Sequence, residues 1–244
     1  MEGFETNDSA ALRMFVINLD KDGDRLRQFQ ESYDASDLQQ QIPLTRFRAV
    51  WGKDVDASRW LTPKAMGEME RVEKQGHRTH HYQLTPGGVG CFLSHYTLAK
   101  QLADESADAY LICEDDVECT PTTYRKMKEA LKKAPGNWDV ILGYTHRVEG
   151  EHELNGFVDV TGFWGMGCYL LSRAGSQKLV LEVETEKMDG QIDAYLSRMA
   201  QQGKMHVYAA PDPWVENTMM DSNIQANLVT VPGIDPFEFR GYRV

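Results

Sequence analysis

Tyr110-Leu-Ile-Cys-Glu-Asp-Asp-Val117 joins an apolar run of strand length to three consecutive carboxylates, Glu114, Asp115 and Asp116. Adjacent negative charges repel, so such a run is tolerated where a cation lies among them or where a strand end is open to water. The carboxyl ends of parallel strands are also where open α/β sheets bind ligands. The stretch therefore predicts either a divalent-metal site or a solvated acidic turn.

Strand-like and helix-like segments alternate along the rest of the chain. Strands are predicted at 14–19, 46–50, 139–142, 168–171 and 205–209, and helices at 25–33, 89–102, 121–134 and 172–183. Ser172 suits the N-cap of the last of these helices, and Pro86 suits a first helical turn. The polar segment 143–156 is expected to be a mobile surface loop, and 162–167 a glycine-spaced turn. This order indicates an α/β sandwich with a mostly parallel sheet.

Composition narrows the class of protein. The chain has 244 residues, 41% of them hydrophobic, which is enough for one large domain or two small ones. Its net charge of -11 argues against a nucleic-acid partner, because phosphate backbones need a basic surface. The four cysteines form no CxxC pair and no metal-ligand spacing, and Cys91 and Cys113, which lie in apolar runs, are expected to be reduced core thiols. Without a transmembrane run or a basic-then-apolar signal peptide, the sequence predicts a soluble, cytoplasmic protein.

Three chemistries use an acidic strand end of this kind. A response-regulator receiver needs a phospho-acceptor Asp on a later strand, but the strand at 139–142 ends in Gly143-Tyr144. A phosphatase of the haloacid-dehalogenase type needs Asp-x-Asp, and two residues after Asp115 stands Val117. A glycosyltransferase needs only carboxylates for a metal that neutralises the donor diphosphate, and a base for the acceptor hydroxyl. The third chemistry fits best.

Short blocks spread along the chain carry a second signal. They are Val16-Ile-Asn-Leu-Asp20 followed by Arg25, Phe47-Arg-Ala-Val-Trp-Gly-Lys53, Leu84-Thr-Pro-Gly-Gly-Val-Gly-Cys-Phe-Leu-Ser-His95, Leu111-Ile-Cys-Glu-Asp-Asp-Val117, Trp138-Asp139, Gly165-Met-Gly-Cys-Tyr-Leu-Leu-Ser-Arg-Ala-Gly175 and Ile192-Asp193. In this order they resemble glycosyltransferase family 25, which includes bacterial lipooligosaccharide and collagen hydroxylysine galactosyltransferases. The resemblance covers roughly residues 13–225.

The resemblance implies a GT-A fold and an inverting hexosyltransferase that uses a UDP-sugar, most often UDP-galactose, with Mn²⁺ or Mg²⁺. A single domain is then expected at 13–229, between an N-terminal tail, 1–12, and a C-terminal docking tail, 230–244. The acceptor would be a hydroxyl of a glycan or glycoprotein. The alternative is a catalytically silent relative that keeps the fold as a binding or adhesion module.

The same resemblance assigns the binding residues. It places Asn18 and Arg25 near the nucleotide, with Arg25 pairing with a phosphate; the alternative for Arg25 is a surface pair with Asp20 or Asp22. Ser94 and His95 would face the donor from a helix. Asp116 would ligate the metal directly, and Glu114 or Asp115 would hold the ribose or a metal-bound water.

The base and the aromatic residues are assigned more broadly. Asp193 is the expected base, with Asp189 as an N-cap, although both could merely favour a helix dipole. Trp164 is a candidate for stacking on a sugar, or a core residue. The histidines at 77, 80 and 81 have metal-like spacing, but a solvated acceptor-side loop is favoured over a metal site. The segment 222–225 is expected to line the donor site.

Overall fold

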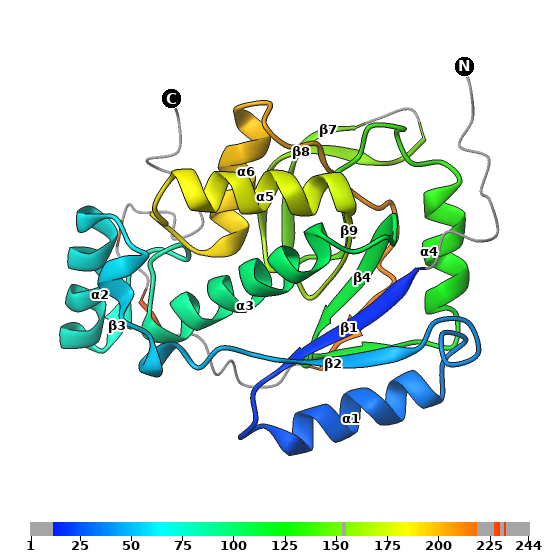
Figure 1. Cartoon of the computed structure of the whole chain (residues 1–244), viewed down its shortest axis with the longest axis horizontal. Coiled ribbons are helices and arrows are strands. Elements are labelled where there is room, and N and C mark those ends of the chain that lie inside the picture. The colour runs from blue at the N-terminus through cyan, green and yellow to red at the C-terminus, as the bar shows by residue number, and fades with distance from the viewer. Residues whose placement is uncertain (1–11, 153–154, 219–226, 230–231, 233–244) are drawn as a thin grey trace.

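A mixed eight-stranded sheet forms the centre of the structure, a computed structural model that describes residues 12–152, 155–218, 227–229 and 232 (Figure 1). The strand order is β2-β1-β4-β9-β6-β10-β8-β7. The strands are β1 (Arg13–Asn18), β2 (Leu44–Arg48), β4 (Ala109–Glu114), β6 (Val140–Tyr144), β7 (Arg147–His152), β8 (Val158–Trp164), β9 (Cys168–Ser172) and β10 (Val207–Ala209). β9 is antiparallel to β4 and β6, and β8 is antiparallel to β10 and β7; the other pairs are parallel. The predicted α/β class with a largely parallel sheet is confirmed.

Helices cover both faces of this sheet because alternate residues of each strand point to opposite sides. Tyr110 and Ile112 of β4 belong to one apolar cluster, and Leu111 and Cys113 to another. The first cluster also contains buried residues of α2 (Pro63–Gln75), α3 (Pro86–Ala103), α5 (Arg173–Thr185) and α6 (Ile192–Gln201). The second contains those of α1 (Gly23–Asp34) and α4 (Thr123–Leu131). A strand buried on both faces needs the near-continuous apolar run that 110–113 provides.

Smaller elements complete the described chain. β5 (Val117–Cys119) pairs with β11 (Val215–Asn217), and β3 (His77–Arg78) pairs with β12 (Asn227–Leu228). Two short 3-10 turns, η1 (Gly52–Asp54) and η2 (Ala57–Arg59), lie before α2. No helix among the described residues is both long and apolar enough to cross a membrane. The expected tails 1–12 and 230–244 lie outside the described residues except for residues 12 and 232, the segment 222–225 lies wholly outside them, and a single domain at 13–229 stays a prediction.

α3 is the central helix of the fold, and its start follows the sequence signals. Pro86 occupies the first turn, and the Thr85 hydroxyl accepts a hydrogen bond from the backbone N–H of Gly88 at 2.9 Å. Its buried residues cover most of the helix surface, and only Thr97, Lys100 and Gln101, on one face of its second half, are exposed. In α5, the Ser172 hydroxyl accepts from the N–H of Gly175 at 2.9 Å, so the predicted N-cap is confirmed.

Two segments differ from the expectation. The segment 143–156 was expected to be a mobile loop, which is wrong, because it contains β7, paired with β8 at the edge of the sheet. β7 is almost entirely exposed, so it lacks the apolar alternation that marks an internal strand. The expected turn at 162–167 is confined to 165–167, since β8 extends to Trp164.

The first turn of α3 lies directly on the segment 50–52, backbone against backbone. A Cβ atom added to Gly90 would lie 2.5 Å from the backbone nitrogen of Gly52 and 2.6 Å from the carbonyl oxygen of Val50. A Cβ atom on Gly52 would lie 1.6 Å from the carbonyl oxygen of Pro86. Glycine is therefore required at both positions, and the contact places the start of α3 beside the end of β2.

Replacing Gly90 by alanine is expected to lower the free energy of unfolding by about 1–3 kcal/mol, because backbone atoms cannot move aside as a side chain can. Gly67→Ala is the matched control, since its added Cβ meets nothing within 4 Å inside α2. That variant should be more stable by about 0.5–1 kcal/mol, because alanine favours a helix over glycine. Urea denaturation of both variants measures the two effects; equal midpoints would contradict the packing described.

Candidate active site

The acidic triplet lies at the carboxyl end of β4, beside the end of β1. Glu114 is the last residue of β4, and Asp115 and Asp116 form the turn that leads into β5. The exposed fraction of the side chain is 19% for Glu114, 10% for Asp115 and 30% for Asp116. The three carboxylates therefore differ in access to solvent, and Asp116 is the most open.

Asp115 is held inside the protein by two partners. The side-chain amide of Asn18 donates to Asp115 Oδ2 at 2.6 Å, and Arg25 Nη2 lies 2.7 Å from Asp115 Oδ1. Asn18 is buried, and its side-chain oxygen accepts from Arg46 Nε at 2.9 Å. These contacts fix the end of β1 to the acidic turn, and they leave Asp115 poorly placed to be a metal ligand.

Arg25 projects from α1 into the triplet. Its Nη2 also lies 3.1 Å from Asp116 Oδ2, so one guanidinium contacts two adjacent carboxylates. The alternative surface pairing with Asp20 or Asp22 is not formed: Asp20 instead pairs with Arg46 and Arg48. Arg25 Nε is buried and makes no hydrogen bond within the described part of the chain. This N–H group therefore remains available to donate a hydrogen bond to a bound anion.

The triplet carries more negative charge than Arg25 offsets. Burial, and then repulsion from Glu114, raise the pKa of Asp116 to about 7. Burial also raises the pKa of Asp115, with Arg25 acting in the opposite direction. Although burial opposes it, the hydrogen bond with His95 keeps the pKa of Glu114 below its usual value. Oxygen ligands of this kind suit a hard divalent cation such as Mg²⁺ or Mn²⁺.

α3 contributes His95 and Ser94 to this site in different ways. His95 is buried, with Nε2 3.1 Å from Glu114 Oε1 and Nδ1 2.8 Å from the hydroxyl of Tyr169. Ser94 uses its hydroxyl within the protein: it donates to the carbonyl of Gly90 at 2.7 Å and accepts from the N–H of Val50 at 2.8 Å. His95 therefore contacts the acidic triplet, whereas the side chain of Ser94 fastens α3 to the chain after β2.

A pocket opens between these elements. Trp51 lies on its wall, and the ammonium groups of Lys21 and Lys53 lie 4.9 and 5.7 Å from the centre of the Trp51 ring. The lining residues are Ile17, Leu19, Asp22, Arg25, Ala49, Val50, Trp51, Gly52, Gly87, Cys91, Ser94, His95, Glu114 and Asp115. Most residues predicted to bind the sugar nucleotide thus line the same cavity as the acidic strand end.

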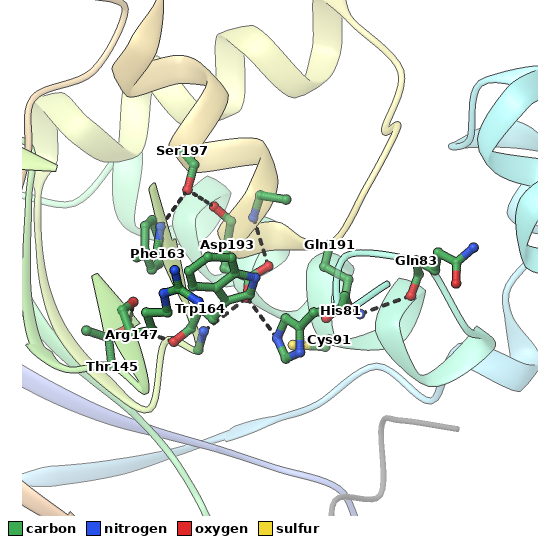
Figure 2. A network of polar contacts seen from close by, with 12 residues as sticks. His81, Gln83, Cys91, Thr145, Arg147, Phe163, Trp164, Gln191, Asp193 and Ser197 are labelled. Carbon is green, nitrogen blue, oxygen red and sulfur yellow. Dashed lines mark hydrogen bonds and ion pairs between the residues drawn. The ribbon is translucent and has the colours of Figure 1, made fainter. Parts of the chain in front are cut away.

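Asp193 lies at the start of α6 in a second polar network (Figure 2). Its Oδ2 accepts from the N–H of Gly165 at 3.0 Å, and its Oδ1 from the N–H of Ala194 at 2.8 Å. His81 Nε2 lies 3.9 Å from Asp193 Oδ2. Burial raises the pKa of Asp193 although the two backbone donors lower it, and the charge of Glu114 raises it further. Asp193 is therefore close enough to the triplet to sense its charge.

Comparison with known proteins gives the family. The profile described as glycosyltransferase family 25 (LPS biosynthesis protein) matches residues 11–158, more than half of the chain. The chain belongs to glycosyltransferase family 25.

Curated proteins similar to this family 25 chain are much longer. Procollagen galactosyltransferase 1 of Danio rerio is 26% identical over 210 residues, which cover 82% of this chain and 33% of that protein. Procollagen galactosyltransferase 2 of Mus musculus is 29% identical over 181 residues, or 68% of this chain and 27% of that protein. The chain thus spans about a third of the length of the curated relatives it matches. Among solved structures, the apo-form glycosyltransferase GlyE of Streptococcus pneumoniae TIGR4 aligns with a TM-score of 0.41 and 8% identity, covering 80% of this chain and 44% of that chain.

Other predicted site residues of the family 25 chain lie elsewhere. Asp189 was expected to cap α6, which is wrong: Gln191 occupies the N-cap position, and Asp189 pairs with Arg198. Trp164 is 2% exposed beneath the guanidinium of Arg147, 4.9 Å from its ring, so it is a core residue and not a stacking platform for a sugar. Among the described residues, the histidines at 77, 80 and 81 form no metal-binding group.

Sequence reasoning missed two residues of the candidate site. His81 was assigned to a solvated loop, yet its side chain is only 12% exposed beside Asp193. Burial, and then the charge of Arg78, lower its pKa to about 4, so the ring is neutral at pH 7. Gln191 holds this segment in place by donating to the carbonyl of His81 at 2.8 Å. Cys91 was interpreted as a core thiol but lines the pocket; its spacing of four residues from His95 on one helix was a usable signal.

Proposed function

We propose that this chain is a metal-dependent glycosyltransferase that moves a hexose, galactose from UDP-galactose, to a hydroxyl of a glycan or glycoprotein with inversion. The observation that carries the proposal is the acidic strand end of β4 beside a pocket that Arg25, His95 and Glu114 line, with Asp193 near enough for the charge of Glu114 to raise its pKa. Galactose as the sugar rests on the names of the procollagen galactosyltransferases, and a lipopolysaccharide-type glycan as the acceptor rests on the family description. A cytoplasmic location stays a prediction of the sequence.

The residues present fit a Mn²⁺ or Mg²⁺ ion. Asp116, the most exposed carboxylate of the triplet, would be the direct ligand, with Glu114 beside it. The raised pKa of Asp116 supports this assignment, because a cation would relieve the repulsion that causes the shift. When bound, such an ion neutralises the charge of the diphosphate leaving group. Asp115 would act as a positioning residue, since Asn18 and Arg25 already hold both of its oxygens.

Donor and acceptor would lie on opposite sides of Glu114. Arg25 offers the diphosphate a guanidinium whose Nε has no hydrogen-bond partner within the described residues. Trp51 offers the uracil ring of the nucleotide an aromatic surface on the pocket wall. Ser94 and His95 would border the nucleotide from α3, with His95 acting through Glu114.

Asp193 is proposed as the base that takes the proton of the acceptor hydroxyl. Its burial and raised pKa suit proton transfer near neutral pH better than an ordinary carboxylate does. Neutral His81 would lie beside this proton-transfer step, 3.9 Å from the carboxylate. No protein nucleophile is needed, because an inverting transfer proceeds in a single displacement.

Purified protein assayed with a panel of sugar nucleotides and Mn²⁺ is expected to use UDP-galactose at least about tenfold faster than its epimer UDP-glucose. Removing divalent ions with a chelator should abolish turnover, and adding Mn²⁺ should restore it. Failure of every donor to be hydrolysed or transferred, together with no UDP binding by calorimetry, would contradict the proposal. UDP binding without turnover would instead support the silent binding module.

A further inference from the structure

Three side chains of different ligand type meet on the wall of the pocket. Cys91 and His95 lie four residues apart on one face of α3, and Glu114 reaches them from the end of β4. Glu114 Oε1 lies 4.0 Å from Cys91 Sγ and 3.1 Å from His95 Nε2, and all three ligand atoms lie within 4.8 Å of one another. Among the described residues, this is the group of three such side chains close enough to share a metal ion.

These distances are close to those around tetrahedral zinc. Bond lengths of about 2.3 Å to sulfur and about 2.0–2.2 Å to nitrogen and oxygen place neighbouring ligand atoms about 3.3–3.6 Å apart. The three groups would therefore need to move by only about 1 Å. A thiolate with an imidazole is also the ligand pair that selects Zn²⁺ and similar thiophilic ions over Mn²⁺ or Mg²⁺.

A second contact orients the histidine. The hydroxyl of Tyr169 lies 2.8 Å from His95 Nδ1, and both side chains are buried. This contact directs Nε2 at Glu114 and Cys91. Metal-bound histidines almost always have such a partner on the second ring nitrogen, where it fixes the orientation of the ring and its tautomer.

Charge and space also favour a cation here. Glu114, Asp193 and Asp116 are all near enough to act electrostatically on the Cys91 thiol, so the local field is negative. The adjoining cavity has a volume of about 60 Å³, several times the 10–15 Å³ that one water needs. An ion bound by three protein ligands would keep its fourth position for water in this cavity.

We propose that Cys91, His95 and Glu114 bind Zn²⁺ or another thiophilic divalent cation at a site separate from the metal expected at Asp116. On binding, the Cys91 thiol loses its proton to solvent and the thiolate forms the metal–sulfur bond. Both contacts of Glu114 with this group use Oε1, so Glu114 would bind the ion through that one oxygen. The inference does not depend on glycosyl transfer.

Cobalt titration of the metal-free protein, kept reduced with a phosphine, tests this site. Sulfur-to-cobalt charge-transfer absorption should appear and reach its maximum with one equivalent of Co²⁺ bound at this site, and excess Zn²⁺ should remove it. Cys91→Ser should lose this absorption, whereas Cys119→Ser, which replaces a buried thiol on β5, should retain it. No charge-transfer band in the parent protein, or a band that persists in Cys91→Ser, would overturn the proposal.

Two further variants locate the site without relying on Cys91. Tyr169→Phe keeps the ring and removes the hydroxyl at His95, so cobalt affinity should fall about 10–100-fold with the band retained. Asp116→Asn should keep the band, with an affinity only a few-fold lower, because Asp116 acts on this group through its charge and is not one of its ligands. Unchanged affinity in Tyr169→Phe would exclude His95 as a ligand, and loss of the band in Asp116→Asn would exclude a separate site. An enzyme without transferase activity should still give these results.

Discussion

Asp116→Asn is expected to lower the metal-dependent transfer rate by roughly 10³-fold, because the metal's contribution to catalysis amounts to several kcal/mol. The variant should be at least as stable as the parent protein. Burial and Glu114 raise the pKa of Asp116 in the folded state, so its charge costs stability as the pH rises from 3.8 towards about 7. An uncharged asparagine removes this cost. Lost activity can then be separated from unfolding.

Glu118→Gln is the matched control, since Glu118 lies two residues away on β5 with its side chain exposed. Mn²⁺ affinity, measured by calorimetry, should fall in Asp116→Asn and stay unchanged in Glu118→Gln, in parallel with the rates. If Asp116→Asn transferred sugar at the parental rate, the metal site would have to lie elsewhere.

Asp193→Asn is expected to lower the transfer rate by about 10²–10⁴-fold, the range contributed by a general base. Asp193 accepts from Gly165 and Ala194 with different oxygens, and asparagine keeps only one of these acceptors, so the variant should stay folded with a stability loss of about 1–3 kcal/mol. UDP and Mn²⁺ affinities should be unchanged, because the acceptor proton is not involved in binding either. A stability defect alone would not produce this separation of rate from affinity.

Asp189→Asn distinguishes a base from a carboxylate that merely belongs to the same segment. Asp189 contacts Arg198 rather than the network around Asp193, so its loss should leave the rate within a few-fold of the parent value. If Asp189→Asn lowered the transfer rate more than Asp193→Asn did, Asp189 would be the base instead. Comparing rates and UDP affinities of both variants is sufficient to decide.

Local signals in the sequence were enough for much of the fold. The apolar run before Glu114 predicts a strand because a strand buried on both faces needs such a run, and Thr85-Pro86 and Ser172 mark helix starts through their own backbone chemistry. The family resemblance is likewise confirmed, because the profile of glycosyltransferase family 25 matches residues 11–158. The roles assigned to individual site residues stay predictions.

What the sequence could not provide depends on contacts between distant segments. β7 is a strand only because β8 pairs with it, and its own residues carry no apolar pattern. His81 lies beside Asp193 with its side chain only 12% exposed, and its carbonyl accepts from Gln191, 110 residues further along. The pairing of Arg25 with two carboxylates of the triplet also joins segments that are far apart in the chain. Spacing along one segment carries no information about such partners.

The burial of α3 over most of its surface, with only Thr97, Lys100 and Gln101 exposed, restricts how this protein can diverge. Substitutions that reshape one face of α3 also disturb the packing of another, so His95 and its neighbours cannot be changed independently of the core. Exposed segments such as β7 carry no such constraint. New acceptor preferences should therefore arise in lineages through changes in these peripheral segments, while the helix that carries His95 changes slowly.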